Sequence, residues 1–165
     1  MSELKITVRR AKPQDVPAIA GLINASRKGK PPLSQQKVRE RILQKGYRIA
    51  ISRQGAAAAG WQTENLVTLV DDFFVYPMEL LIELASPLLE EVEKAAAELA
   101  CEAIIFFLDP DGPEQAFSFL LDKGYLPREM GSLHPYWREV AQERIGDNSV
   151  MMVKQTSDEI RMEPF

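Results

Sequence analysis

Residues Val67 to Leu108 read VTLVDDFFVYP, then MELLIELASPLLEEVEKAAAELA, then CEAIIFFL. The first and last runs are rich in β-branched and aromatic residues, whereas the middle run consists mostly of strong helix formers. Two apolar strands joined by such a helix predict a parallel βαβ unit with a right-handed crossover. We expect this unit to form the centre of the fold.

The residues before this unit predict five further elements. These are a strand at Leu4–Arg10, helices at Pro13–Ser26 and Ser34–Lys45, and strands at Tyr47–Ser52 and Ala56–Thr63. Ser34 is suited to cap the second helix, and Gly46 is suited to end it. Ala56 to Ala59 favour a helix by propensity, but their place after a hairpin turn favours a strand whose small side chains allow close packing.

The residues after the unit predict two helices and two strands. These are a helix at Pro113–Lys123 ended by Gly124, a strand beginning at Tyr125, a helix at Pro135–Ile145 ended by Gly146, and a strand at Ser149–Lys154. This order predicts an α+β fold in a single domain over residues 1–154. Residues 155–165 then form a loose tail, or an arm that packs on a partner in a homodimer.

Composition narrows the classes of function. The chain has 165 residues, of which 45% are hydrophobic, with a net charge of −4 and a pI near 5.2. This acidic balance argues against nucleic acid or an anionic membrane as the main partner, since either requires a basic face on the protein. Cys101 is the single cysteine and His134 the single histidine, so a Cys/His zinc site is excluded and no metal is expected. No long apolar run or signal-peptide pattern is seen, so we expect a cytoplasmic protein.

Three motifs in this order resemble the GNAT superfamily of acetyl-CoA-dependent N-acyltransferases. They are the opening VRRAKPQDVPAIAGLI, the strand end FFVYP, and AFSFLLDKGYLP around the short helix. With the order of the elements, the resemblance extends over nearly the whole chain. The chain is also similar to a small set of uncharacterised GNAT-like proteins from thermophilic bacteria.

The resemblance implies a mixed, mostly antiparallel sheet that is splayed at the central parallel βαβ unit, with helices on both faces. It implies transfer of an acyl group from acetyl-CoA, or another acyl-CoA, to an amine on a small molecule or peptide. In the family, the pantetheine arm of the cofactor bonds to the backbone of the fourth strand in the splay. Phe74, Val75 and Tyr76 match that position and are the expected cofactor contacts.

The chain departs from the family pattern at two places. The cofactor's pyrophosphate is bound in the family by a glycine-containing loop at the start of the crossover helix, whereas here Glu79 and Glu83 follow Pro77 and no glycine is present. Ser86, followed by Pro87, is an alternative helix start and cofactor contact. In many members a tyrosine of the short helix protonates the thiolate, and here Leu120 occupies its place. A fold that has lost catalysis and serves as a ligand-binding or dimerisation module is therefore the alternative.

The adjacent carboxylates Asp71 and Asp72 are the candidate catalytic residues, because burying them within an apolar strand is costly. Successive strand residues point to opposite faces, so one of them faces the core or a cleft. The functional interpretation is a general base for the amine, and the structural one is a β-bulge or a solvated rim. Other candidates for lining a cleft are Glu64, Tyr76, Tyr125, His134 and Tyr136. A third possibility is an apolar ligand between Phe73, Phe74, Phe106 and Phe107.

Overall fold

The computed structural model describes residues 4–26, 31–144 and 149–158. The strands are β1 (Thr7–Arg10), β2 (Gly46–Ile51), β3 (Ala56–Glu64), β4 (Val67–Tyr76), β5 (Ala103–Leu108), β6 (Leu126–Arg128) and β7 (Val150–Gln155). The α-helices are α1 (Val16–Ser26), α2 (Gln35–Gln44), α3 (Leu81–Glu98), α4 (Glu114–Asp122) and α5 (Pro135–Arg144). Short 3₁₀ turns are η1 (Pro13–Asp15), η2 (Met78–Leu80) and η3 (Met130–Ser132).

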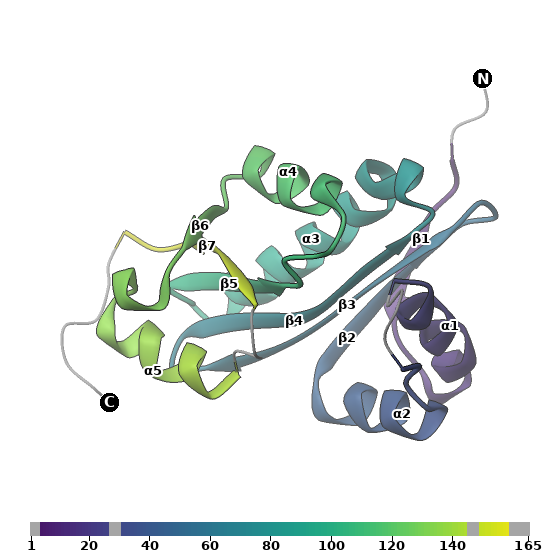
Figure 1. The fold of residues 1–165 in the computed structure, drawn as a ribbon, viewed down its shortest axis with the longest axis horizontal. Helices are drawn as coiled ribbons and strands as arrows, with labels where there is room; N and C mark the ends of the chain where they lie inside the picture. Colours follow the sequence, from purple (N-terminus) through teal and green to yellow (C-terminus); the bar gives the residue numbers. More distant parts are fainter. Residues whose placement is uncertain (1–3, 27–30, 145–148, 159–165) are drawn as a thin grey trace. The chain divides into compact units, whose positions relative to one another are not determined.

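The seven strands pair in the order β1-β2-β3-β4-β5-β7-β6. β4 and β5 run parallel over Val67–Val70 and Ala103–Phe106. The pairs β1–β2, β2–β3, β5–β7 and β6–β7 are antiparallel. The predicted α+β class, with its mixed sheet and central parallel pair, is therefore confirmed (Figure 1).

The chain forms two compact units. The first contains the residues up to Trp61 together with Asp72–Glu91, and the second contains Gln62–Asp71 and the residues from Val92 onward. β3, β4 and α3 each contribute residues to both units.

In the first unit, α1 and α2 cover one face of β2 and β3. In the register of these strands, Ile49 pairs with Ala58 and Tyr47 pairs with Gly60. The buried cluster on this face consists of Ala11, Val16, Ile19, Ala20, Leu22, Ile23, Val38, Tyr47, Ile49 and Ala58. The alanine run is thus a strand, as predicted, and Ala58 allows close packing against the helices.

Two capping predictions for α2 have different outcomes. The Ser34 hydroxyl accepts a hydrogen bond from the N–H of Lys37 at 3.2 Å, which confirms the predicted N-cap. The helix ends at Gln44, one residue before the predicted Lys45, but the predicted capping role of Gly46 is wrong, because Gly46 is the first residue of β2. A methyl group on Gly46 would lie 3.3 Å from Cε2 of Trp61, so the ring of Trp61 takes the space of a side chain.

In the second unit, helices cover both faces of the strands. α5 packs Trp137 and Val140 against a buried cluster that includes Ile105 and Val153. Lys154 pairs with Ile104 across the sheet, so its side chain lies on the other face, where Nζ is 2.9 Å from Oε2 of Glu93 on α3. These contacts confirm the predicted helices on both faces for this unit.

The predicted helix ends after α3 and α4 can be compared with the structure. Gly124 has φ of +92° directly after α4, as expected of a glycine that ends a helix. Leu121 and Leu99 are exposed, whereas Phe119 is buried in α4. α3 ends at Glu98, and Ala100 with φ of +54° turns the chain away. The predictions for Gly146 and for residues 159–165 lie outside the described residues.

Candidate functional site

Asp72 is the buried charge on β4 in the first unit. Its carboxylate is 2% exposed and lies on the sheet face that carries Tyr47 and Gly60. A methyl group on Gly60 would lie 2.5 Å from Cε2 of Tyr47 and 3.3 Å from Cβ of Asp72. The missing side chain of Gly60 therefore makes room for the ring of Tyr47 beside Asp72.

Two cations from the end of α2 meet this carboxylate. Nη1 of Arg41 donates to Oδ1 of Asp72 at 2.8 Å, and Nζ of Lys45 lies 3.6 Å from Oδ2. Arg41 and Lys45 are four residues apart, which places them on one side of the helix end. The Lys45 side chain is 10% exposed, whereas that of Arg41 is 31% exposed.

The pairing offsets the cost of burying a carboxylate. An isolated buried charge is strongly unfavourable, and removing one partner of a buried pair typically costs about 3–5 kcal/mol. Sequence reasoning identified Asp72 and missed Arg41 and Lys45. One sequence signal could have indicated these partners. Arg41 and Lys45 are two cations one helical turn apart at the end of a predicted helix, and a nearby strand carries a carboxylate with no predicted partner.

Asp71, the other candidate carboxylate, belongs to the second unit and is half-buried. Strand alternation points its side chain to the face opposite that of Asp72. The structural alternative of two solvated carboxylates is wrong for Asp72, because its side chain is buried and paired with cations.

The end of β4 carries the three predicted cofactor contacts. Phe74 packs against the cluster under α1 and α2, Val75 is buried, and the Tyr76 side chain is 59% exposed. The Tyr76–Pro77 peptide bond is cis. The turn between β2 and β3 lies close to this bond, since a methyl group on Gly55 would be 2.5 Å from the carbonyl oxygen of Tyr76. Only a glycine fits at that position of the turn.

The crossover helix begins directly after Pro77. The N–H of Leu80 donates to the carbonyl of Pro77 at 3.1 Å, and η2 continues into α3 without a break. Glu79 and Glu83 are both exposed in these first turns. The alternative helix start at Ser86 is wrong, because Ser86 and Pro87 lie inside α3. Pro87 lacks the N–H that would bond to the carbonyl of Glu83, four residues earlier.

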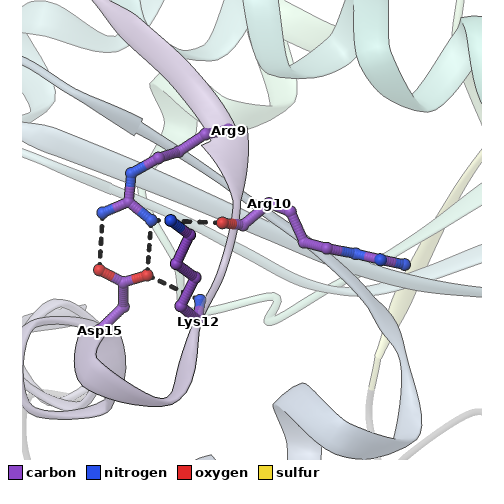
Figure 2. A network of polar contacts seen from close by, with 4 residues as sticks. All are labelled: Arg9, Arg10, Lys12 and Asp15. Atoms are coloured by element: carbon purple, nitrogen blue, oxygen red, sulfur yellow. Dashed lines mark hydrogen bonds and ion pairs between the residues drawn. The ribbon is translucent and has the colours of Figure 1, made fainter.

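The start of α1 is fixed by the Arg and Asp of the opening motif (Figure 2). Both Nη atoms of Arg9 donate to the carboxylate of Asp15 at 2.7 Å, and the N–H of Lys12 donates to the same carboxylate at 2.7 Å. The hydrogen bond from Arg9, with a further contribution from Lys12, holds the pKa of Asp15 below its usual value. This motif is therefore a structural connection between β1 and α1.

In the second unit, Leu120 and Tyr125 are both fully buried. Leu120, at the position where the resemblance predicts a tyrosine, has no group that exchanges a proton. Tyr125 donates to Oε2 of Glu93 at 3.3 Å and packs edge-on against Phe106. Burial, together with the charge of Glu93, raises the pKa of Tyr125 far above its ordinary value. A phenol in that environment is a poor proton donor.

The other candidates in the second unit have structural contacts. Nδ1 of His134 accepts from the N–H of Tyr136 at 3.4 Å at the start of α5, and Glu64 accepts from Arg144. Cys101 is buried, with Sγ 3.3 Å from Oγ1 of Thr68. Phe106 and Phe107 lie on opposite faces of β5, since Phe107 packs in the cluster under α5, so the two do not line one apolar surface. Within the described residues, no group of three or more His, Cys, Asp or Glu residues is arranged to hold a metal ion.

Solved structures with the same fold are acetyltransferases. A GNAT-family acetyltransferase from Staphylococcus aureus Mu50 is similar over 93% of this chain and 100% of its own, with a TM-score of 0.73 and 14% identity. An N-acetyltransferase from Thermoplasma acidophilum in complex with coenzyme A is similar over 92% of this chain and 99% of its own, with a TM-score of 0.68 and 12% identity.

N-acetylglutamate synthase from Neisseria gonorrhoeae, complexed with coenzyme A and N-acetyl-glutamate, is similar over 94% of this chain, with a TM-score of 0.68 and 17% identity. The chain spans only 36% of that enzyme's length. In sequence, the chain matches no family model and no curated protein. The likeness to these solved structures shows that the fold is GNAT-like. In the described part of the chain, no helix combines the length and apolar character needed to cross a membrane.

Proposed function

We propose that this protein is an N-acyltransferase that uses acetyl-CoA, or another acyl-CoA, to acylate an amine. The observation that carries the proposal is the likeness of the fold, over more than nine-tenths of the chain, to acetyltransferases solved with coenzyme A. A cytoplasmic location and a homodimer remain predictions that accompany it.

The proposed position of the cofactor is at the end of β4 and the start of α3, which belong to one unit. The pantetheine arm pairs with the backbone at Phe74, Val75 and Tyr76. Such contacts require N–H and C=O groups and do not depend on the side chains. The pyrophosphate then lies at the N–H groups of Met78 and Glu79, which precede the first hydrogen-bonded N–H of the turn, that of Leu80. With the pyrophosphate there, the thioester end of the arm points back along β4 toward Asp72.

The negative charges of Glu79 and Glu83 weaken the binding of a pyrophosphate at this helix start. Both carboxylates are exposed in the first turns, where they compete with an anion for the positive end of the helix. We therefore expect weaker cofactor binding than a glycine-containing loop would give. Removing both charges should increase the affinity for acyl-CoA.

The two aspartates are proposed to have different roles. An amine has little access to Asp72, because its carboxylate is 2% exposed and contacts Arg41 and Lys45. We assign it to positioning these cations. The half-buried Asp71, whose side chain points to the opposite face of β4, is the proposed general base and takes the proton from the attacking amine through a water molecule. Because Leu120 supplies no acid, the thiolate leaves without a proton from the tyrosine position.

The test is release of free CoA from acetyl-CoA in the presence of a panel of primary amines, with acetylated product identified by mass spectrometry. Wild-type protein should release CoA in an amine-dependent manner. Asp71→Asn should lower kcat by about 10²-fold or more, with the deficit reduced at high pH, where more of the amine is already deprotonated. CoA release that does not depend on any amine would contradict the proposal.

A second candidate is a GNAT-like fold that binds a ligand without catalysis. It is favoured by Leu120 at the tyrosine position and by Glu79 and Glu83 at the helix start. Binding of CoA without acyl transfer to any amine would support it.

A further inference from the structure

The guanidinium of Arg41 is hydrogen-bonded to a buried carboxylate, and the side chain is still partly exposed to solvent. Its Nη1 is fixed on the buried carboxylate of Asp72 at 2.8 Å, and the side chain keeps 31% of its exposure. Within the part of the chain that the structure describes, Asp72 is the only hydrogen-bond or ion-pair partner of Arg41. The N–H groups of Nε and Nη2 therefore stay available for a ligand.

A guanidinium fixed in this way is a pre-organised receptor for a carboxylate. Arginine presents planar N–H donors that match two carboxylate oxygens, and a side chain already held in place loses less conformational entropy on binding. A buried ion pair contributes little to stability compared with apolar residues of similar size. Fold stability alone therefore does not account for an aspartate at this place on β4.

The position along β4 adds a geometric argument. Asp72 precedes Val75 by three residues, which corresponds to about 10 Å along a strand. Arg41 thus stands beside the middle of β4, toward which the thioester of a cofactor bound at the strand end points.

We infer that Arg41 binds a carboxylate of the acyl acceptor, so that the acceptor is an amine that also carries a carboxylate, such as an amino acid or the end of a peptide. The inference rests on the proposed function, because it assigns the acceptor of that reaction. Asp72 is then a positioning residue that acts through Arg41.

The experiment compares two product-like probes that differ in charge, N-acetylglycine and its amide N-acetylglycinamide. Binding is followed by NMR titration of labelled protein, with and without CoA, so that carboxylate recognition is measured separately from cofactor binding. Arg41→Gln removes the receptor. Arg39→Gln, an exposed arginine on the same helix, is the matched control.

Wild-type protein and Arg39→Gln should bind the charged probe about tenfold more tightly than the amide, and Arg41→Gln should lose this preference. Arg41→Lys should keep part of it, because it retains the charge without the planar donors. Equal binding of the two probes, an equal loss in both glutamine variants, or no binding of N-acetylglycine at about 10 mM would overturn the inference. If acetyl-CoA fails to bind while the preference remains, the proposed function fails and the carboxylate site stands.

Discussion

Arg41 of α2 donates to the buried carboxylate of Asp72 on β4 at 2.8 Å, joining residues that are 31 positions apart in the chain. This pair fixes the end of the helix against the strand. The ion pair also offsets the cost of burying the carboxylate, and the side chain of Arg41 stays partly exposed.

Asp72→Asn should strongly destabilise the protein, since it leaves Arg41 and Lys45 without their carboxylate. We expect a loss of about 3 kcal/mol in the free energy of unfolding, measured by urea denaturation. Asp111→Asn, in an exposed turn, is the control and should change stability by no more than about 0.5 kcal/mol. Equal effects of the two substitutions would show that the buried pair has no stabilising role.

Asp15→Asn should remove a pH-dependent contribution. The pKa of Asp15 is lowered by Arg9, so its stabilisation is complete above the ordinary aspartate pKa of about 3.9 and is lost as the pH falls through the lower folded value. The wild type should exceed the variant by about 2 kcal/mol at neutral pH, and the difference should shrink toward about pH 3. Urea denaturation at both pH values is the measurement. A difference that grew at acid pH would contradict the lowered pKa.

Two glycine substitutions should act in opposite directions. Gly60→Ala places a methyl group 2.5 Å from the Tyr47 ring and should cost about 1–3 kcal/mol. Gly21→Ala, in α1, meets nothing within 4 Å and should stabilise the protein by about 0.5–1 kcal/mol through higher helix propensity. Thermal denaturation of both variants tests the pair. If Gly60→Ala were neutral, Tyr47 would not be packed over Gly60.

Tyr125 should not ionise while the protein is folded, because burial and Glu93 raise its pKa. The unfolded chain loses this proton near pH 10, so stability should fall as the pH rises above that value. In an absorbance titration, Tyr125→Phe should have the same tyrosinate signal as the wild type until unfolding. In urea, the wild type should then show one additional tyrosinate. A smaller signal for the folded variant would mean that Tyr125 ionises in the native state.

The sequence predicted the long helices and strands well because their residue patterns differ clearly from one another. The apolar runs of β4 and β5, rich in β-branched and aromatic residues, and the helical spacing in α1 follow from burial, and all three elements fold where the pattern indicated. The wrong predictions of element bounds lie mostly at helix ends. Ser86–Pro87 has the local pattern of a helix start, but Leu81 and Leu84 are buried, and their packing extends the helix toward its N-terminus.

The candidate site was predictable only in part. An aspartate in an apolar strand stands out in a sequence, whereas its partners do not. Arg41 and Lys45 look like ordinary surface cations of α2 until the fold brings them to Asp72. Pairs at such sequence separation depend on tertiary packing, and local patterns contain no record of them.

This fold is proposed to bind an acyl-CoA at the end of β4 and the start of α3. Isothermal titration calorimetry with acetyl-CoA tests it most directly, on the wild type and on two variants. The first is Glu79→Ala with Glu83→Ala. The second is Glu90→Ala with Glu98→Ala, which removes the same charge elsewhere on α3.

We predict that the wild type binds acetyl-CoA, that the first variant binds it about tenfold more tightly, and that the second changes little. No heat of binding in any of the three at millimolar acetyl-CoA would contradict the account. Equal gains in both variants would contradict the proposed position of the pyrophosphate.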